Sequence, residues 1–269
     1  MALKTSLSGL VGDAKVYVGS NPVDKIYVGA NAAYYGLVTS NLIVHIDAEN
    51  ANSYSGSGTA ITDLQGNHNA TLAGAFNNTT PKNWELDKEA GASVEFITFG
   101  DIETFNAPKD FTFSLWFEFT SISSDHDIYS KGTHGTNMPI LCWYDAAVGG
   151  GADAGNSQTI SFMVTDDDTM HWISAPNNSI VAGQIYNLVV QHNTSGRARI
   201  WINGVEKRDH TQSGTDGMKN STNPLKIGAP NTGGNDSDMK VYAFHAYDSF
   251  LTDAQIDQNW NHLKGRFGL

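Results

Sequence analysis

Two acidic residues, Asp101 and Glu103, have a type and spacing that could support acid–base chemistry. If their segment were a strand, both carboxylates would lie on one face at roughly 7 Å, a separation that glycoside hydrolases use. A polar turn that leaves a strand explains the same residues without chemistry. We favour the turn, expect no enzymatic activity and keep glycoside hydrolysis as an alternative.

Oxygen-rich loops are the second candidate for chemistry. Calcium takes several oxygen ligands, including backbone carbonyls, and loop carboxylates supply them. Asp and Asn also stabilise turns through their own side chains, so such loops do not require a metal. We expect no obligatory cofactor and name Asp236 and Asp238 as ligands if calcium is bound. The clusters are Asp125-His126-Asp127, Asp166-Asp167-Asp168 and Asn235-Asp236-Ser237-Asp238.

Aromatic residues in the predicted strands are the third candidate. An exposed ring can stack on a sugar ring, whereas tryptophans in strands more often pack in a core. Trp201 is open to either use. We name Trp143, Tyr144 and Trp172 as the candidate carbohydrate-binding residues.

Composition excludes several classes of function. The 269 residues carry 28 acidic and 16 basic side chains, a net charge of −12, which disfavours nucleic acid and anionic membranes as partners. The sequence contains neither a Gly-x-Ser-x-Gly motif nor a phosphate-binding loop. The single cysteine, Cys142, excludes an intrachain disulfide and is expected to be a buried thiol. The first residues lack the apolar run of a signal peptide, so we expect synthesis in a cytoplasm and no membrane insertion.

A hairpin over residues 183–206 is the clearest structural element. Apolar and polar residues alternate on both sides of an Asn-Thr-Ser-Gly turn, which predicts two antiparallel strands with one buried face. Asn203-Gly204 predicts a second tight turn, because both residues tolerate positive φ. In the segment 111–119, five large apolar residues alternate in the same way and predict a buried strand.

The rest of the main body reads as further strands and one helix. Short alternating runs recur to residue 247, and a helix is then predicted with Thr252 as N-cap, Gln255 completing a capping box and Gly265 as its end. Ile256, Trp260 and Leu263 would form its apolar stripe. About a dozen short strands with one helix indicate an all-β, antiparallel two-sheet sandwich.

Residues 1–36 contain a repeat and form a predicted segment of their own, ahead of a domain at 37–269. Lys15 to Asn21 recurs as Lys25 to Asn31, each copy a short strand closed by glycine. A two-stranded hairpin is marginal in water, so we favour intermolecular assembly over docking within the chain. The repeat resembles Lys-aliphatic-Tyr-aliphatic-Gly repeats near the ends of tailed-phage structural proteins. The predicted anchoring residues are Val16, Tyr17, Val18, Ile26, Tyr27 and Val28.

Four segments carry a resemblance in the order 44–48 with 63–67, 110–116, 129–132, and 183–206 with the 241–256 tail. Together they resemble the laminin-G-like, concanavalin A-like jelly-roll family. Asp63-Leu64-Gln65-Gly66-Asn67 is similar to the family's Asp-x-Ser-Gly-Asn turn, with Gln65 where serine is usual. The segment 110–116 is similar to the strand that enters the sandwich centre, and Tyr129-Ser130-Lys131-Gly132 to the turn that follows. The 183–206 hairpin and the 241–256 tail complete the order. Related β-sandwich glucanases use a Glu-x-Asp-x-x-Glu strand, which this chain lacks, because Asn106 stands at the last position.

These observations favour a virion structural protein made in the host cytoplasm. The repeat would anchor it to other virion proteins of a capsid or tail, as a decoration, head-fibre or tail-fibre component. Closed symmetry is the default for such assemblies, so we expect a homo-oligomer and favour a trimer. The alternative is a lectin-like module that binds a host-surface glycan.

Overall fold

The computed structural model describes most of the chain, which divides into two compact units. One unit is Asn41–Leu251, and the other combines Met1–Ser40 with Thr252–Leu269. The described residues are 16–18, 21–23, 25–28, 31–87, 94–106, 109–133, 137–146, 158–166, 169–211, 218–230 and 235–269.

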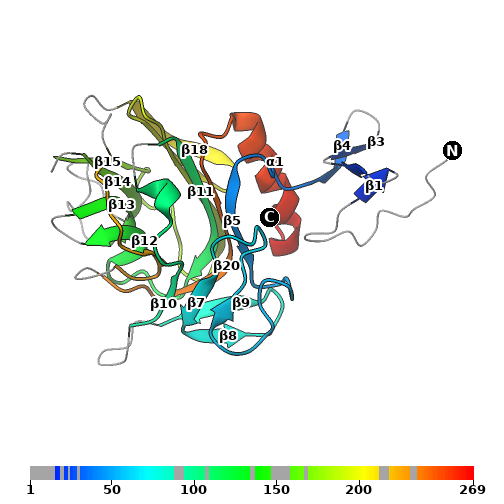
Figure 1. The fold of residues 1–269 in the computed structure, drawn as a ribbon, viewed down its shortest axis with the longest axis horizontal. Coiled ribbons are helices and arrows are strands. Elements are labelled where there is room, and N and C mark those ends of the chain that lie inside the picture. The colour runs from blue at the N-terminus through cyan, green and yellow to red at the C-terminus, as the bar shows by residue number, and fades with distance from the viewer. Residues whose placement is uncertain are drawn as a thin grey trace. The chain divides into compact units, whose positions relative to one another are not determined.

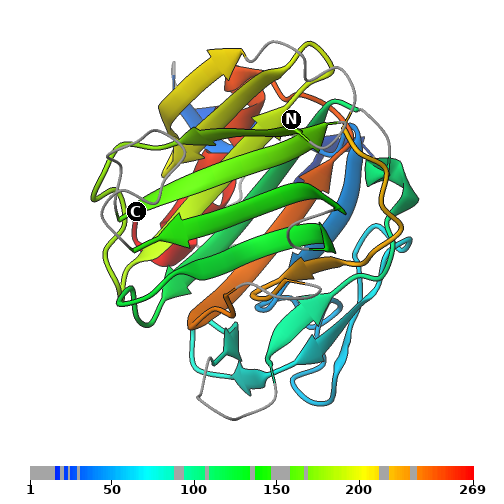
Figure 2. The ribbon, with the colours of Figure 1, turned by 90° about the vertical axis from the view of Figure 1, so that its left-hand side faces the viewer.

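The first sheet of the larger unit, called here the β13 sheet, has eight strands among the described residues. Their spatial order is β15-β14-β13-β12-β19-β10-β7-β6, and neighbouring strands run antiparallel. Figure 2 faces this sheet and shows its long green strands crossing those of the other sheet behind them. The strands are β6 (Ala60–Ile61), β7 (Ala70–Ala73), β10 (Phe96–Thr98), β12 (His126–Thr133), β13 (Asn137–Asp145), β14 (Thr159–Asp166), β15 (Thr169–Ser174) and β19 (Leu225–Ile227).

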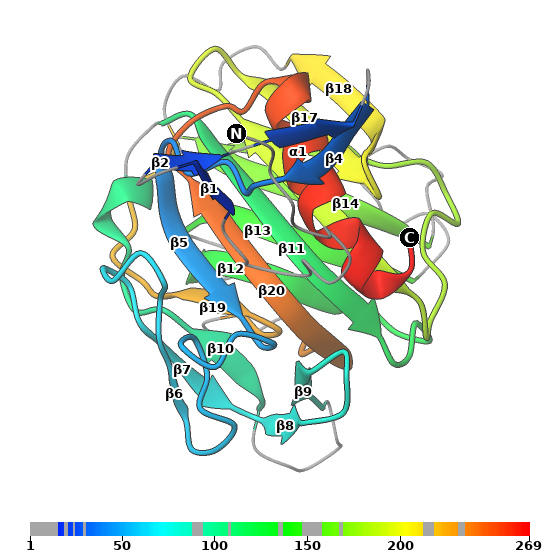
Figure 3. The same cartoon turned by 90° about the vertical axis from the view of Figure 1, so that its right-hand side faces the viewer.

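The second sheet, called here the β11 sheet, is also antiparallel. Its order is β18-β17-β16-β11-β20-β9-β8, and β5 pairs with the part of β20 that β9 does not cover. Figure 3 shows β20 between β5 and β11. The strands are β5 (Leu42–Asp47), β8 (Ala75–Asn77), β9 (Asn83–Leu86), β11 (Phe111–Phe119), β16 (Ile185–His192), β17 (Arg197–Ile202), β18 (Val205–Thr211) and β20 (Met239–Tyr247).

The two sheets pack face to face as the predicted all-β sandwich (Figure 1). The apolar row of β11 lies in the core between them, and each of its five side chains is completely buried. Burial of a large apolar side chain stabilises a fold by about 1.5–3 kcal/mol, so this row is a main source of stability. Its members are Phe111, Phe113, Leu115, Phe117 and Phe119.

The central hairpin has the predicted turns. Asn193 closes the β16–β17 turn by accepting the Ser195 and Arg197 backbone N–H groups at 3.1 and 3.0 Å. Asn203 and Gly204 both have positive φ, 52° and 72°, and connect β17 to β18. Such φ values suit the twist of paired strands, which is why the Asn-Gly signal was reliable.

The segment around Gly132 corrects a prediction. Tyr129 to Gly132 was expected to turn the chain, but it lies inside the eight-residue strand β12. Tyr129 is buried in the core, and its backbone neighbours Ser130 and Lys131 pair with both β13 and β19. Gly132 has a φ of 111°, so it produces an irregularity within the strand rather than a turn.

The smaller unit contains the predicted helix. Helix α1 (Asp253–Leu263) has Thr252 as N-cap, and Thr252 and Gln255 form the expected capping box. Within the same unit, the buried Asn259 accepts the Val38 backbone N–H at 2.9 Å. The α-helix ends at Leu263, two residues before the predicted end at Gly265. A 3₁₀ turn, η2 (Lys264–Phe267), follows and ends where Gly268 takes a φ of 72°.

The sequence repeat forms two separate hairpins. Strand β1 (Val16–Val18) pairs with β2 (Asn21–Val23), and β3 (Lys25–Val28) pairs with β4 (Asn31–Tyr35). Each repeat copy therefore supplies the first strand of its own hairpin. The structure describes the strands of this segment but not their side chains, so the anchoring role of the named residues stays a prediction.

Candidate functional site

Strand β13 presents apolar side chains on both of its faces. Ile140, Cys142 and Tyr144 point into the core between the sheets. By alternation, Leu141 and Trp143 lie on the outer face of the β13 sheet. Adjacent aromatic residues therefore have opposite surroundings, and this difference decides which of them can meet a ligand.

Cross-strand pairing extends the outer face over β14 and β15. Leu141 pairs with Met163, and Met163 pairs with Trp172, so these three side chains form one row. Residues directly opposite in an antiparallel ladder share a face and lie close together. Trp172 is 39% exposed and Met170, two residues earlier on β15, is 44% exposed.

A second row runs parallel to the first. Trp143 pairs with Ser161, which pairs with Ser174. The two serine hydroxyls lie 2.8 Å apart, are buried, and hydrogen-bond to each other. Trp143 is half-buried and packs on Leu141 and Met163. The indoles of Trp143 and Trp172 are thus the largest side chains of what we call the Trp143–Trp172 face, comprising Leu141, Trp143, Ser161, Met163, Met170, Trp172 and Ser174.

Carboxylates border the Trp143 end of this face. Asp127 on β12 pairs directly opposite Trp143, and Asp145 lies two residues beyond Trp143 on the same face. Asp125 is held nearby, because it accepts the Ala146 backbone N–H at 2.9 Å. Burial raises the pKa of Tyr144, and the charges of Asp145 and Asp125 raise it further.

The three predicted carbohydrate-binding aromatics have different positions. Trp143 and Trp172 belong to the Trp143–Trp172 face, as described above. Tyr144 is completely buried in the core, where its ring stacks with His126 and packs against Phe119. Its position corrects the expectation of a ring that stacks on sugars. Trp201, the other aromatic considered, is also buried.

The predicted calcium loop is anchored to β12 by hydrogen bonds. Asn235 and Asp127 form two hydrogen bonds. The Asp127 N–H donates to the Asn235 carbonyl at 2.8 Å, and the Asn235 N–H donates to the Asp127 carboxylate at 3.2 Å. Ser237 donates to the Asp127 carbonyl at 2.8 Å. The loop that carries Asp236 and Asp238 is therefore held by long-range hydrogen bonds to β12.

Within the described part of the chain, no three His, Cys, Asp or Glu side chains gather as a metal site would require. Calcium also accepts backbone carbonyls, so binding at Asp236 and Asp238 stays a prediction. Residues 167 and 168 of the Asp166-Asp167-Asp168 cluster lie outside the described residues. None of the described helices is long and apolar enough to cross a membrane.

Asp101 and Glu103 do not share a strand face. Asp101 lies in a loop, and Glu103 begins the short 3₁₀ helix η1 (Glu103–Phe105). Lys131 donates to the Asp101 carboxylate at 2.6 Å and to the Asn223 carbonyl at 2.8 Å. Asp101 therefore holds a buried ammonium group in place, which agrees with the predicted structural role.

The electrostatics of this pair follow from burial. The Lys131 side chain is fully buried, and this burial lowers its pKa, although Asp101 offsets part of the effect. Burial opposes ionisation of Asp101, but hydrogen bonds from Lys131 and Asn106 and the Lys131 charge lower its pKa on balance. The contact between the two side chains links the loop to β12.

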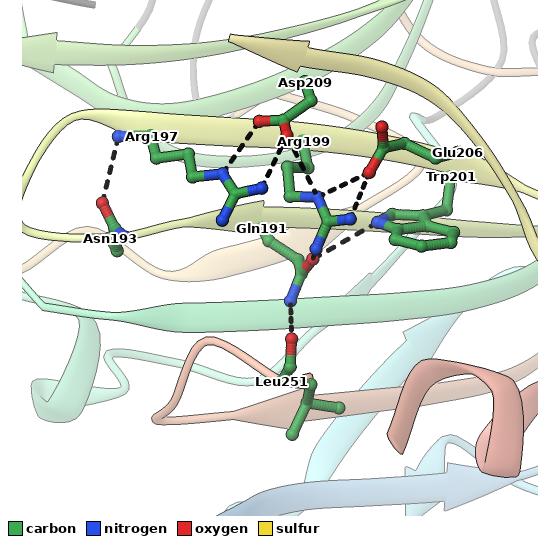
Figure 4. Close-up of polar contacts among 8 residues, drawn as sticks. All are labelled: Gln191, Asn193, Arg197, Arg199, Trp201, Glu206, Asp209 and Leu251. Atoms are coloured by element: carbon green, nitrogen blue, oxygen red, sulfur yellow. Dashed lines mark hydrogen bonds and ion pairs between the residues drawn. The ribbon is translucent and has the colours of Figure 1, made fainter. Parts of the chain in front are cut away.

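The polar face of the central hairpin was expected to be exposed, yet it forms a buried network (Figure 4). Gln191 donates to the Leu251 carbonyl at 2.8 Å and accepts the Trp201 indole N–H at 3.3 Å. The Arg199 guanidinium lies 4.5 Å from the centroid of the Trp201 ring and pairs with Glu206. The network satisfies buried polar groups and explains the burial of Trp201.

A neighbouring ion pair extends this network toward the surface. Arg197 donates two hydrogen bonds to the Asp209 carboxylate, at 2.9 and 2.6 Å. These bonds lower the pKa of Asp209. Because the Arg199 side chain is only 4% exposed, its ion pair with Glu206 helps to hold β17 against β18.

Comparisons with known proteins agree with the sandwich architecture. A laminin G family model, described as the concanavalin A-like lectin/glucanases superfamily, matches residues 91–257. No curated protein matches the chain in sequence.

Solved structures with a similar fold include three botulinum neurotoxin domains. The binding domain of botulinum neurotoxin DC in complex with rat synaptotagmin II has a TM-score of 0.61 at 14% identity, over 82% of this chain and 51% of that chain. A type C structure, titled for cell entry dependent on two ganglioside molecules, has a TM-score of 0.61 at 15% identity, over 82% of this chain and 51% of that chain. A DC binding domain in complex with SialylT has a TM-score of 0.59 at 13% identity, over 82% of this chain and 51% of that chain. The chain spans about half the length of these proteins.

Proposed function

Because the chain belongs to the concanavalin A-like lectin/glucanases superfamily, we propose that it is a non-enzymatic carbohydrate-binding module. The Trp143–Trp172 face is the proposed glycan site. The observation that carries the proposal is the exposed indole of Trp172, 39% accessible, in register with Met163 on a sheet face that also holds Trp143. Aromatic rings presented on a sheet provide the apolar surface on which sugar rings stack.

Two further observations support a binding role without catalysis. Asp101, the candidate acid, is engaged by Lys131 and Asn106, and Glu103 lies outside any strand. One similar toxin structure is titled for interaction with two ganglioside molecules and another is a complex with SialylT, so a sandwich of this shape occurs in proteins that bind glycans.

A glycan array, read with calcium and with a chelator, tests the proposal. We expect binding to a defined set of glycans, and loss of that binding in Trp172→Ala. The control Val205→Ala removes another exposed apolar side chain, 54% accessible, from β18 of the other sheet and should leave binding unchanged. An array without hits, or equal binding by the Trp172 variant, would contradict the proposed site. Binding that is present with calcium and lost with the chelator would support the predicted calcium site.

A second candidate function comes from the N-terminal hairpins. We propose that β1–β4 attach the protein to a larger assembly, as in a virion structural protein displayed on a capsid or tail. Two-stranded sheets are marginal alone in water, and the repeat supplies two of them in tandem. The two functions are compatible, because an anchored display protein can carry a glycan-binding domain.

Mass spectrometry of purified particles tests the virion assignment, which requires the protein to be present in stoichiometric amounts. Absence from particles would contradict it. Deletion of residues 1–36 should abolish incorporation while leaving glycan binding intact. Analytical ultracentrifugation of the full chain tests the expected trimer.

A further inference from the structure

The outer face of the β13 sheet is accessible over strands β7, β10 and β19. Ile97 and Ile227 point into the core, so by alternation Thr98 and Lys226 lie on the outer face. Thr98 pairs with Lys226 on one side and with Thr71 on the other, which places these three side chains in one row. Thr71 is exposed, whereas Thr98 and Lys226 are half-buried. The row therefore presents two hydroxyl groups and one amine to solvent.

Phe96 lies beside this row and holds the amine of Lys226. Its ring is half-buried, two residues before Thr98 on the same face, and the Lys226 nitrogen lies 4.3 Å from the ring centroid. Such a contact attracts an ammonium group and restricts a long side chain that otherwise samples many rotamers. The amine is therefore held in a defined place. We call this surface, which comprises Thr71, Phe96, Thr98 and Lys226, the Phe96–Lys226 patch.

The patch is separate from the Trp143–Trp172 face. Lys226 pairs with Ser130 on β12, which is completely buried, and Ser130 pairs with the buried Leu141 on β13. Buried positions thus interrupt the outer face of the sheet between the two surfaces. A ligand on the patch contacts neither tryptophan, so a site here goes beyond the proposed glycan face.

The charge of Lys226 determines what this patch attracts. Among the described residues, Lys226 has no ion-pair partner, and its contact is the Phe96 ring. Burial lowers the pKa of Lys226, and the charge of Asp236 offsets part of this effect. A negatively charged ligand in direct contact would favour the protonated amine further. The net charge of −12 opposes anions at long range, but salt screens exposed charges beyond about 10 Å.

We propose that the Phe96–Lys226 patch binds an acidic sugar, whose carboxylate pairs with Lys226 and whose ring hydroxyls contact the two threonines. The Thr98 hydroxyl accepts the Gly100 backbone N–H at 3.5 Å and keeps its own hydrogen for a ligand. The Cα atoms of Thr71 and Lys226 are two strand spacings apart, about 10 Å, which accommodates one sugar ring. Phe96 supplies apolar contact beside it. A uronic acid combines a carboxylate and hydroxyl groups in this way.

Glucuronate and glucose test the proposal as a matched pair, because they differ only in the carboxylate. The backbone amide signals of Thr71, Thr98 and Lys226 are followed in ¹H–¹⁵N spectra of the full chain as each sugar is added, with acetate as a carboxylate that lacks the ring. We expect saturable shifts with glucuronate at a concentration at least tenfold lower than with glucose or acetate. An equal response to glucose overturns the role of charge, and an equal response to acetate overturns the sugar. Unmoved signals with all three overturn the site.

Variants then assign binding to the patch. Lys226→Met keeps the length of the side chain but removes the amine, so it should weaken glucuronate binding at least about tenfold. The control Lys82→Met makes the same charge change just before β9 of the other sheet and should leave binding unchanged. Equal losses in the two variants would indicate a general charge effect and overturn the site. Circular dichroism confirms that each variant is folded.

Trp172→Ala separates this site from the proposed glycan face. It should leave glucuronate binding unchanged, because Trp172 lies outside the patch. A glycan array without hits would therefore contradict the glycan face and leave the glucuronate result standing. Loss of glucuronate binding in Trp172→Ala, but not in Lys226→Met, would place the acidic sugar on the Trp143–Trp172 face and overturn the proposed patch.

Discussion

Lys131 donates a hydrogen bond to Asp101 at 2.6 Å from a side chain that is fully buried. The contact joins the interior of β12 to the loop that precedes η1. It gives Asp101, a candidate for acid–base chemistry in the sequence, a structural role. It also predicts that removal of the Asp101 charge lowers the stability of the fold.

Asp101→Asn should lower the free energy of unfolding by about 1–3 kcal/mol, because it leaves a buried ammonium without its counter-charge, while the partial exposure of Asp101 moderates the loss. Urea denaturation at pH 7 measures this change. Glu103→Gln, two residues away and exposed, is the matched control and should change stability by less than about 0.5 kcal/mol. Because the pKa of Asp101 is lowered in the folded state, its stabilisation is present above the unfolded pKa and is lost as the pH falls through the folded value. Similar effects of the two variants would contradict the assigned role.

Acid should destabilise the protein partly through His192. Burial lowers the pKa of His192 from 6.5 to about 4, with the Asp110 charge opposing and the His171 charge adding to the effect. The unfolded chain then binds a proton that the folded chain does not, so stability falls as pH drops from about 6.5 toward 4. The expected loss is about 3 kcal/mol.

His192→Leu should remove that part of the pH dependence, because leucine takes up no proton. Urea midpoints between pH 7 and pH 4 measure the slope. His210→Gln, at an exposed position of β18, is the control and should keep the wild-type slope. An unchanged slope in the leucine variant would show that His192 is not responsible.

Gly228 should be intolerant of substitution. Its φ is +89°, and an added Cβ would lie 2.3 Å from Cδ1 of the buried Leu86. Gly228→Ala should therefore cost at least about 2 kcal/mol from strain and overpacking together. Gly58, with a φ of +81° and no atom within 4 Å of an added Cβ, isolates the strain, and Gly58→Ala should cost about 1 kcal/mol. Thermal denaturation compares the two, and equal costs would contradict the predicted clash.

Asp63 should be essential to the turn after β6. Its carboxylate accepts four backbone N–H groups at 2.8–3.1 Å, and it is 1% exposed. Asp63→Ala should cost about 2–4 kcal/mol, because four backbone donors, of which the His45 N–H is buried, lose their acceptor. Asp63→Asn retains one acceptor oxygen and should cost less. The donors are His45, Gln65, Asn67 and His68. A smaller loss for alanine than for asparagine would contradict this role.

Several elements were predictable from local pattern. Strand β11 alternates large apolar residues with smaller or polar ones, and both its bounds and its buried row agree with the prediction. Asn203-Gly204 and the Thr252 capping box are turn and cap signals with a local physical cause, so they needed no tertiary information.

Other features depended on contacts that the local pattern does not contain. Strand β13 is apolar on both faces, so alternation alone did not tell whether Trp143 or Tyr144 points outward. Lys131 and Gly132 looked like a turn, but burial of Lys131 against Asp101 keeps them within a strand. The polar face of the central hairpin looked solvent-exposed, yet Gln191 and Arg199 are buried in a network that includes Leu251.

The central claim is that the Trp143–Trp172 face binds glycan, and the indole N–H signals of the six tryptophans test it most directly. A two-dimensional ¹H–¹⁵N spectrum is recorded while the glycan that binds best on the array is added. We predict that the Trp143 and Trp172 signals move in a saturable way, whereas those of the buried Trp84 and Trp116 stay in place. Saturable binding that leaves the Trp143 and Trp172 signals unmoved would contradict the account.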